Sequence, residues 1–294
     1  MNRVTVVVAT HNRCCQLLKY LPRHDAPVVL VDNGSDDGTA EVVRGRFPHV
    51  RVIRLDENIG AAARTLGVAA AETPYVAFAD DDSYWEPGAL DRAAGLLAAH
   101  PRAALLTGRV LVGEHGRPDP ISDCMAAAPL GTDPDLPGPS VLGFLACAAV
   151  VRREPFLTVG GFEPKLHVYG EEALLAMDLA SAGWGLAYVP SLVVRHLPEA
   201  AGRDQRARRR RQARNDLLTA WLRRPTGIGV RAAVRALARP DTRAGLTDAL
   251  SELSWVRRHR QPVPAPVEAA LRVLETGPPA GVPAAAPAPV PVDG

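Results

Sequence analysis

Long apolar segments are missing from this 294-residue sequence. Its longest apolar stretch, residues 142–151 with one glycine, is far shorter than the ~20 residues that a helix needs to cross a bilayer. The first residues also lack the apolar region and the small-residue cleavage site of a secretory signal peptide. We therefore expect a cytoplasmic protein, and contact with the inner face of the plasma membrane stays open.

Cysteine and lysine are both scarce. The four cysteines, Cys14, Cys15, Cys124 and Cys147, form no C-x-x-C pair, so we expect inert or buried thiols and neither a zinc ribbon nor a disulfide framework. Only two of the 34 basic residues are lysines, and the net charge of +2 creates no global field for nucleic acid. Hydrophobic residues at 47% and charged residues at 22% are usual for globular proteins, which excludes a wholly disordered or fibrous chain.

Two phosphate-binding loops are also absent. No G-x-G-x-x-G follows the first apolar run, and no G-x-x-x-x-G-K-[ST] occurs, so the sequence is neither a dinucleotide-binding nor a P-loop enzyme. Instead, nearly continuous apolar runs predict buried parallel strands at residues 4–9, 28–31, 50–55, 75–79 and 103–112. Helical patterns separate them, at residues 14–21, 39–47, 61–71 and 88–99. This order predicts an α/β fold, a three-layer α/β/α sandwich with a mostly parallel central sheet, whose ligands bind beyond the carboxyl ends of the strands.

Composition divides the chain into three zones. Residues 1–200 carry the α/β pattern, and residues 201–275 are rich in arginine and alanine and predict helices. Residues 276–294 are almost entirely proline, alanine, glycine and valine, which predicts a disordered tail. We therefore expect a large α/β domain followed by a helical accessory region.

Polar clusters follow four of the predicted strands. They comprise Thr10, His11, Asn12 and Arg13; Asp32 with the turn residues 33–39; Asn58 and Gly60 before a helix that carries Arg64; and Asp80, Asp81 and Asp82. Turn and capping chemistry explains much of residues 33–38 but explains Asp32 less well, because that acid directly follows a buried strand. Three consecutive carboxylates repel one another unless a cation neutralises them, and their oxygens suit Mg²⁺ or Mn²⁺. A solvated acidic turn is the alternative.

These four clusters, in this order and spacing, resemble the motifs of family 2 glycosyltransferases, which have the GT-A fold. The resemblance covers about residues 3–200. It implies a nucleotide-sugar donor, a divalent metal and inversion at the anomeric carbon. It also implies a nucleotide-sugar-binding half at about residues 1–112 and an acceptor half at about residues 113–200.

The resemblance assigns roles to individual residues. Residues 10–13 correspond to the nucleotide-binding entry loop, and Asp32 to the acid that hydrogen-bonds the base. Arg64 corresponds to an arginine near the diphosphate, with Asn58, Gly60 and Asp81 in the same donor site. Asp80 and Asp82 correspond to the D-x-D metal pair, with Asp82 the more direct ligand, and His196 to a histidine that completes the metal site. Because Asp32 favours a base that presents an N–H, uracil, thymine and guanine all qualify, and we expect UDP or dTDP.

The general base is predicted at the start of a later helix. Family members have a Glu-Asp pair there whose second acid deprotonates the acceptor hydroxyl. Here the pair is Glu171 and Glu172, so Glu172 is the expected base and Glu171 the other candidate. Leu174 replaces a further acid of the family pattern. The expected acceptor is a hydroxyl group of a cell-envelope glycan, a lipid-linked molecule or a small molecule.

Other functions stay open. A sugar-nucleotide nucleotidyltransferase would need a glycine-rich, arginine-containing loop after the first strand, and residues 10–13 are not one. The arginines of residues 203–224 suggest nucleic-acid binding, but neither aromatic interleaving nor a known module accompanies them, and we expect no nucleic-acid partner. The apolar residues 217–222 beside them could pack on the catalytic domain or lie on a membrane. A donor-binding protein without catalysis is the third alternative.

Overall fold

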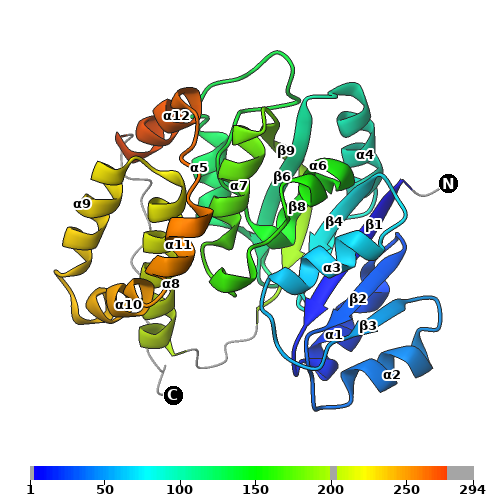
Figure 1. Ribbon diagram of the computed structural model, residues 1–294. Helices are drawn as coiled ribbons and strands as arrows, with labels where there is room; N and C mark the ends of the chain where they lie inside the picture. Colours follow the sequence, from blue (N-terminus) through cyan, green and yellow to red (C-terminus); the bar gives the residue numbers. More distant parts are fainter. Residues whose placement is uncertain (1–2, 199–203, 277–294) are drawn as a thin grey trace, which may run out of the picture.

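A nine-stranded sheet forms the centre of the molecule in the computed structural model, which describes residues 3–198 and 204–276 (Figure 1). The strand order is β3-β2-β1-β4-β8-β6-β9-β5, and β7 pairs with β6. The strands are β1 (Val4–Thr10), β2 (Val28–Asp32), β3 (Arg51–Arg54), β4 (Tyr75–Ala79), β5 (Ser83–Trp85), β6 (Ala103–Val112), β7 (Arg117–Pro118), β8 (Ala149–Arg152) and β9 (Gly185–His196). Strands β1, β2, β3, β4, β6 and β9 run one way, and β5, β7 and β8 run the other. The predicted mostly parallel sheet is therefore confirmed.

Helices cover both faces of this sheet. The helices of the α/β region are α1 (Cys14–Tyr20), η1 (Leu21–Arg23), α2 (Thr39–Arg46), α3 (Ala62–Ala70), α4 (Ala89–Ala99), α5 (Pro120–Ala126), η2 (Ala146–Ala148), α6 (Arg153–Thr158), η3 (Pro164–Leu166) and α7 (Glu171–Ser181). Leu17 of α1 and Leu97 of α4 pack with Val6 and Val8 on one face. Phe156 of α6 and Leu175 of α7 pack with Val7 on the other, because successive strand side chains point to opposite faces. The three-layer α/β/α prediction is confirmed.

The last long strand contains a bulge. The apolar residues 186–189 and 192–194 belong to one strand, β9, which pairs in parallel with β6. Its register shifts where Gly108 pairs with Val189 and the next residue, Arg109, pairs with Val193. A β-carbon at Gly108 would lie 2.3 Å from the Leu192 carbonyl oxygen, so glycine lets the bulged backbone approach. Pro190 within this bulge explains the apparent break in the pattern.

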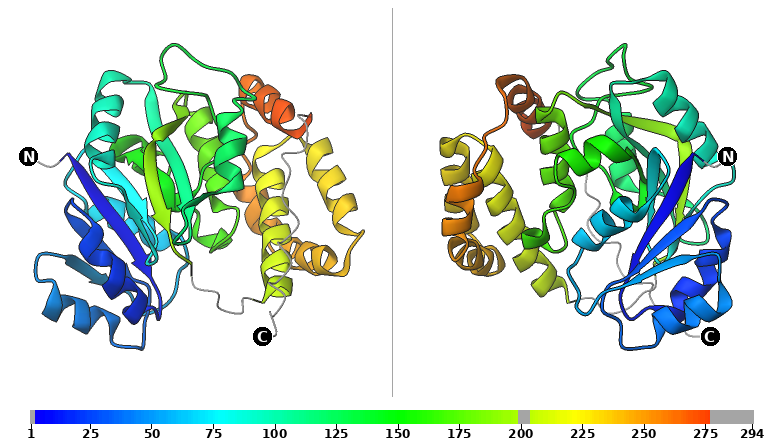
Figure 2. Two further views of the ribbon diagram at one scale, coloured as in Figure 1. Left: turned by 180° about the vertical axis from the view of Figure 1, so that it is seen from behind. Right: turned by 45° about the vertical axis from the view of Figure 1, so that its right-hand side comes forward.

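In the described part of the chain, five helices follow the α/β region and lie beyond α7, at the end of the molecule opposite β3 (Figures 1 and 2). They are α8 (Gln205–Arg223), α9 (Thr226–Ala236), α10 (Pro240–Leu250), α11 (Leu253–His259) and α12 (Ala265–Thr276). Leu217, Leu218 and Leu222 of α8 are buried against Leu166 and Leu174. The apolar stripe of α8 thus packs on the α/β region, the first of the two arrangements left open. The predicted tail lies, apart from Thr276, outside the described residues.

The arginines of α8 face carboxylates of the neighbouring helices. Arg209 pairs with Asp241 at 3.0 Å and Arg210 with Asp248 at 2.6 Å. Arg214 lies 3.3 Å from Glu252. These ion pairs join α8 to the α10–α11 segment, so much of the basic zone serves helix packing. Within the described residues, no helix is both long and apolar enough to span a membrane.

The cysteines and Trp85 differ in how far they are exposed to solvent. Cys147 is buried and Cys15 is exposed, and all four cysteines are free thiols. For Cys15, burial is excluded, and the prediction of an inert thiol is the alternative that stays. Trp85 is 2% exposed, and its Nε1 donates to the Phe78 carbonyl at 3.0 Å, so it belongs to the core.

Candidate active site

The first two strands deliver their terminal polar residues to one edge of the sheet. Strands β1 and β2 are parallel, and Thr10 pairs directly with Asp32. The Thr10 hydroxyl donates to Asp81 at 2.9 Å, which ties this edge to the residues that follow β4. The Asn33 backbone N–H donates to the Thr10 carbonyl at 2.8 Å. Thr10 therefore meets Asp32 and Asp81, which lie 22 and 71 positions later in the sequence, at the carboxyl ends of the strands. This is the edge where ligands bind in folds of this kind.

Asp32 is a buried carboxylate with one satisfied oxygen. The side chain is 1% exposed, and Oδ1 accepts the Ser35 backbone N–H at 3.0 Å. Oδ2 is buried and has no hydrogen-bond partner among the described residues. A buried acceptor without a donor is costly, so this oxygen is suited to a ligand N–H.

Asn33 joins the second strand to the loop before α3. Its Nδ2 donates to Asn58 Oδ1 and to the Gly60 carbonyl, each at 3.0 Å. Its Oδ1 accepts the Ile59 N–H at 2.9 Å. The sequence analysis gave Asn33 no role of its own, although its position directly after Asp32 placed it at the strand-end edge.

The loop of residues 11–13 folds back on its neighbours. Nδ1 of His11 lies 3.0 Å from the Asn33 carbonyl oxygen, and the Asn12 N–H donates to Ser35 Oγ at 3.0 Å. Arg13 reaches the acids after β4, with its Nε 3.6 Å from Asp81 and its Nη2 3.4 Å from Asp82. The loop thus places Arg13 beside two carboxylates at the carboxyl ends of the strands.

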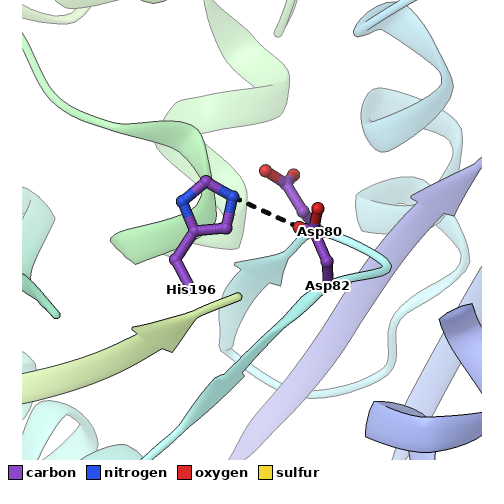
Figure 3. Close-up of side chains that lie close together, drawn as sticks. All are labelled: Asp80, Asp82 and His196. Atoms are coloured by element: carbon purple, nitrogen blue, oxygen red, sulfur yellow. Dashed lines mark ion pairs between the residues drawn. The ribbon is translucent and has the colours of Figure 1, made fainter. Parts of the chain in front are cut away.

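Asp80, Asp82 and His196 come together at the ends of different strands (Figure 3). One ligand atom from each lies within 4.8 Å of the others. His196 pairs in register with Ser83, which follows Asp82, and its Nε2 lies 3.2 Å from Asp82 Oδ1. Two carboxylates and one imidazole are donors that Mn²⁺ and Mg²⁺ accept, and the three groups fit one divalent ion. These are the three residues that the sequence proposed as metal ligands.

Arg64 connects this cluster to the acids of α7. Its guanidinium donates to the Asp80 carboxylate. Burial alone would lower the pKa of Arg64, but Asp80, Glu171 and Glu172 outweigh it and raise the pKa. Arg64 is therefore a fixed positive charge among three carboxylates, at the place expected for a diphosphate.

Asp81 has a different environment from its two neighbours. It accepts the Thr10 hydroxyl and lies beside Arg13, and it is outside the three-residue ligand cluster. Burial raises the pKa of Asp81 to about 6, although the hydrogen bond from Thr10 opposes that rise. Asp81 therefore joins the loop after β1 to the loop after β4.

Glu171 and Glu172 occupy the first turn of α7, after Gly170 in a left-handed conformation (φ 89°). Glu171 is 4% exposed and its Oε2 has no hydrogen-bond partner among the described residues, whereas Glu172 is half-buried. Burial raises the pKa of Glu171 to about 8, and the Glu172 carboxylate adds to the rise. Burial also raises the pKa of Glu172. The pair therefore forms a buried acidic site, close to Arg64 and Asp80, in which ionisation is disfavoured.

Stability should fall with rising pH because of Glu171. A carboxyl whose pKa is raised from 4.5 to about 8 on folding stabilises the protein fully below pH 4.5, and this contribution is lost as pH rises towards 8. In urea unfolding at pH 8 without metal, the free energy of unfolding of Glu171→Gln should therefore exceed that of the wild type by roughly 1–4 kcal/mol. At pH 4.5 the two proteins should differ little in this free energy. Glu154→Gln, at the exposed first turn of α6, is the control. If Glu154→Gln changed the free energy of unfolding at pH 8 as much as Glu171→Gln does, the raised pKa of Glu171 would be contradicted.

The loop before α7 is held by Asn215 of α8. Asn215 is fully buried, and its Nδ2 donates to the carbonyls of Leu166, Val168 and Tyr169 at 2.7, 3.1 and 2.7 Å. This loop is unusual, because His167 and Tyr169 both have positive φ. The sequence analysis missed Asn215, since it lies in the arginine-rich zone with nothing in the local pattern to mark it.

The same loop also contacts the turn before α3. The His167 carbonyl accepts the Ala61 N–H at 2.6 Å, and a β-carbon at Gly60 would lie 2.2 Å from that carbonyl oxygen. Only glycine fits there. Nε2 of His167 lies 3.3 Å from the Asn58 carbonyl oxygen, and its Nδ1 lies 3.4 Å from Arg211 of α8. Helix α8 thus supports both the Asn58–Gly60 turn and the start of α7.

Asn215→Leu should destabilise the protein much more than a comparable change nearby. It leaves one buried and two partly buried carbonyls without their donor, which should cost about 2–4 kcal/mol of unfolding free energy. Gln212→Leu, also on α8, removes only a hydrogen bond to Asp216 and should cost less than about 1 kcal/mol. Urea unfolding of both variants makes the comparison, and equal losses would show that the Asn215 amide does not hold the loop.

Two solved structures illustrate the similarity of the fold. A mannosyltransferase from Pyrobaculum calidifontis, PcManGT in complex with GDP-Man and Mn²⁺, aligns with a TM-score of 0.57 at 21% identity, over 93% of this chain and 86% of that chain. GalNAc-T7 with UDP, GalNAc and Mn²⁺ aligns with a TM-score of 0.60 at 16% identity, over 88% and 54%. At these identities the likeness shows the fold, and the GT-A expectation is confirmed.

Curated relatives agree with the family resemblance. The N-acetylglucosaminyl-diphospho-decaprenol L-rhamnosyltransferase of Mycobacterium tuberculosis is 31% identical over 211 residues, 60% of this chain and 68% of that protein. The pre-mycofactocin glycosyltransferase of the same organism is 30% identical over 251 residues, 83% of this chain, and the match spans about half (49%) of that relative. The family model described as glycosyl transferase family 2 matches residues 4–160, more than half of this chain. The chain therefore belongs to glycosyl transferase family 2 and is a glycosyltransferase enzyme.

Proposed function

We propose that this protein is a metal-dependent inverting glycosyltransferase that moves a sugar from a UDP- or dTDP-sugar to an acceptor hydroxyl. One observation carries the proposal most strongly: Asp80, Asp82 and His196 form a three-ligand cluster, and Arg64 links it to the acids of α7. A sugar bound here would have both a charge-stabilised leaving group and a proton acceptor within reach. Family membership supports the same reaction class.

The donor base would be bound at Asp32. Its unpartnered buried Oδ2 is an acceptor suited to an N–H of uracil or thymine. The entry loop (Thr10, His11, Asn12 and Arg13) and the turn with Asn58 and Gly60 would border the nucleotide, because Asn33 joins both to the end of β2. Asp81 would hold this border together through Thr10 and Arg13.

Mg²⁺ or Mn²⁺ would be held by Asp80, Asp82 and His196. When bound, such an ion offsets the negative charge that develops on a departing diphosphate. Arg64 would act on the same charge from the protein side, since its guanidinium is fixed by Asp80. Solved neighbours of the same fold contain Mn²⁺, which favours manganese without excluding magnesium.

The chemical step would be a direct displacement. Glu172 accepts the proton of the acceptor hydroxyl, whose oxygen forms a bond to the anomeric carbon from the face opposite the diphosphate. The bond from that carbon to the diphosphate oxygen breaks, and the nucleoside diphosphate leaves with the electron pair. Glu172 is proposed as the base because it holds the place of the second acid of the family pair, and its side chain is also more exposed than that of Glu171, which is 4% exposed. Attack from the opposite face inverts the anomeric centre.

The acceptor is proposed to be a lipid-linked or cell-envelope glycan. The supporting observation is the rhamnosyltransferase relative, whose name specifies a diphospho-decaprenol acceptor. Such an acceptor would place the reaction at the inner face of the plasma membrane. The alternatives have less support: residues 10–13 form no glycine-rich nucleotidyltransferase loop, and the arginines of α8 are largely paired with carboxylates.

A thermal-shift panel of nucleoside diphosphates tests this proposal. UDP or dTDP with Mn²⁺ should raise the melting temperature more than ADP, and a ligand at 100 times its Kd adds about 2.7 kcal/mol to the folded state. The rise in melting temperature should disappear with EDTA. It should be smaller in Asp32→Asn, in which an amide NH₂ group replaces one acceptor oxygen. An equal response to ADP, or one that is indifferent to metal, would contradict the donor assignment.

A further inference from the structure

Helix α9 exposes an unusual apolar ridge. Among the large apolar side chains of the described residues, Val230, Val234 and Leu237 are the most exposed, at 58%, 62% and 56%. Their spacing of four and three residues places them on one side of the helix, and we call them the α9 ridge. Another side of the helix is buried, with Gly229 and Ala236 against the other helices. The ridge is therefore an exposed side of a helix that is packed on another side.

Two arginines border the α9 ridge. Arg231 and Arg235 are exposed, lie one turn apart, and line a pocket of about 420 Å³ between α7, α8, α9 and α12. Ala173, which follows Glu172 on α7, lines the same pocket. The arginines thus lie between the ridge and a pocket that reaches the helix carrying the proposed base.

The charge of these arginines is not neutralised within the described part of the chain. The arginines of α8 pair with Asp241, Asp248 and Glu252. No described carboxylate comes within 4.0 Å of Arg231 or Arg235. Even the two acids of the shared pocket bond elsewhere, Asp216 to Gln212 and Glu275 to Arg224. Helix α9 therefore offers two positive charges beside exposed apolar surface.

We propose that α9 docks on an anionic lipid bilayer. The α9 ridge enters the boundary between headgroups and acyl chains, and Arg231 and Arg235 bind lipid phosphates. A helix that has an apolar face bordered by arginines is the pattern that binds such interfaces. The surface differs from the one suggested by the sequence, because the apolar stripe of α8 is buried. The inference does not depend on the proposed reaction, since docking involves neither donor nor acceptor.

Other partners fit this surface less well. A second copy of the chain, packed through the same ridge about a two-fold axis, would bring like charges of Arg231 and Arg235 together. A nucleic acid would engage the arginines but leave the apolar ridge in water. An anionic bilayer satisfies both features at once.

Vesicle co-sedimentation of the full chain tests the docking. The wild type should bind vesicles that contain phosphatidylglycerol, bind pure phosphatidylcholine weakly, and lose affinity as salt is raised. An arginine near an anionic surface contributes about a fivefold gain in binding, so Arg231→Glu with Arg235→Glu should lower affinity by about 25-fold or more. Val230→Glu with Val234→Glu should lower it comparably. Unchanged donor binding by these variants confirms that they are folded.

Matched controls locate the surface. Arg257→Glu with Arg258→Glu on α11 makes the same change in net charge, and Val273→Glu alters an exposed valine (46%) on α12. Both should bind vesicles like the wild type. The proposal would be overturned if the α9 variants bound vesicles as tightly as the wild type. It would also be overturned if the control variants lost as much affinity as the α9 variants. Vesicle-free self-association that the ridge variants abolish would assign the surface to a second copy instead, and duplex binding that only the arginine variants abolish would assign it to nucleic acid.

Discussion

Asp82→Asn is expected to abolish metal-dependent turnover of the donor while leaving the protein folded. Asp82 Oδ1 lies 3.2 Å from His196 Nε2, and the side chain is one of three potential ligands that converge within 4.8 Å. Asparagine has nearly the same size but lacks the negative charge that binds a divalent cation. Because changes at groups that merely support a ligand cost 10–100-fold, loss of the ligand itself should lower donor hydrolysis by about 100-fold or more.

The measurement is donor hydrolysis across a titration of Mn²⁺, with melting temperature as the check on folding. Asp81→Asn is the matched control, because it removes the same charge from the adjacent residue, which lies outside the ligand cluster. Asp81 interacts with Thr10 and Arg13, so its replacement should weaken nucleotide affinity and leave the dependence on Mn²⁺ intact. Full metal-dependent activity in Asp82→Asn would show that the metal is bound elsewhere or is not needed.

The strand-end residues could be predicted from the sequence because their positions follow from local pattern and one topological rule. Asp32 and Asp80 each follow a nearly continuous apolar strand, and parallel strands gather their carboxyl ends at one edge. Family motifs then related His196, more than 100 residues later, to the same site. Its proximity to Asp82 depends on the antiparallel pairing of β5 with β9, which no local pattern specifies.

Residues that act through tertiary contacts could not be predicted in this way. Asn215 lies in an arginine-rich helix, and its role appears only when α8 packs against the loop before α7. The arginines of α8 suggested a free basic face because their partners, Asp241 and Asp248, lie on another helix. The same packing buries the apolar stripe of α8 and leaves the α9 ridge exposed. Helix-to-helix register, rather than periodicity within a helix, decides which faces are free.

Glu172→Gln is expected to collapse transfer while leaving donor binding nearly unchanged. A general base acts on the acceptor proton in the transition state, and its removal costs about 10²–10⁴ in rate. Glutamine preserves size and hydrogen bonding but cannot accept the proton. Because burial raises the pKa of Glu172, wild-type transfer should also decline on acidification at a higher pH than an ordinary glutamate, with its pKa of 4.5, would give.

Glu171→Gln is the internal control for this assignment, since the two acids are adjacent on the first turn of α7. Glu171 is 4% exposed, so an acceptor hydroxyl has less access to it than to the half-buried Glu172. The comparison needs kcat for transfer and Kd for the nucleoside diphosphate in both variants. A larger kcat loss in Glu171→Gln would move the base to Glu171, one position earlier than the family pattern implies. If both variants retained wild-type kcat, the proton would leave through another group, and the displacement would have to be driven by leaving-group stabilisation at Asp80, Asp82, His196 and Arg64 alone.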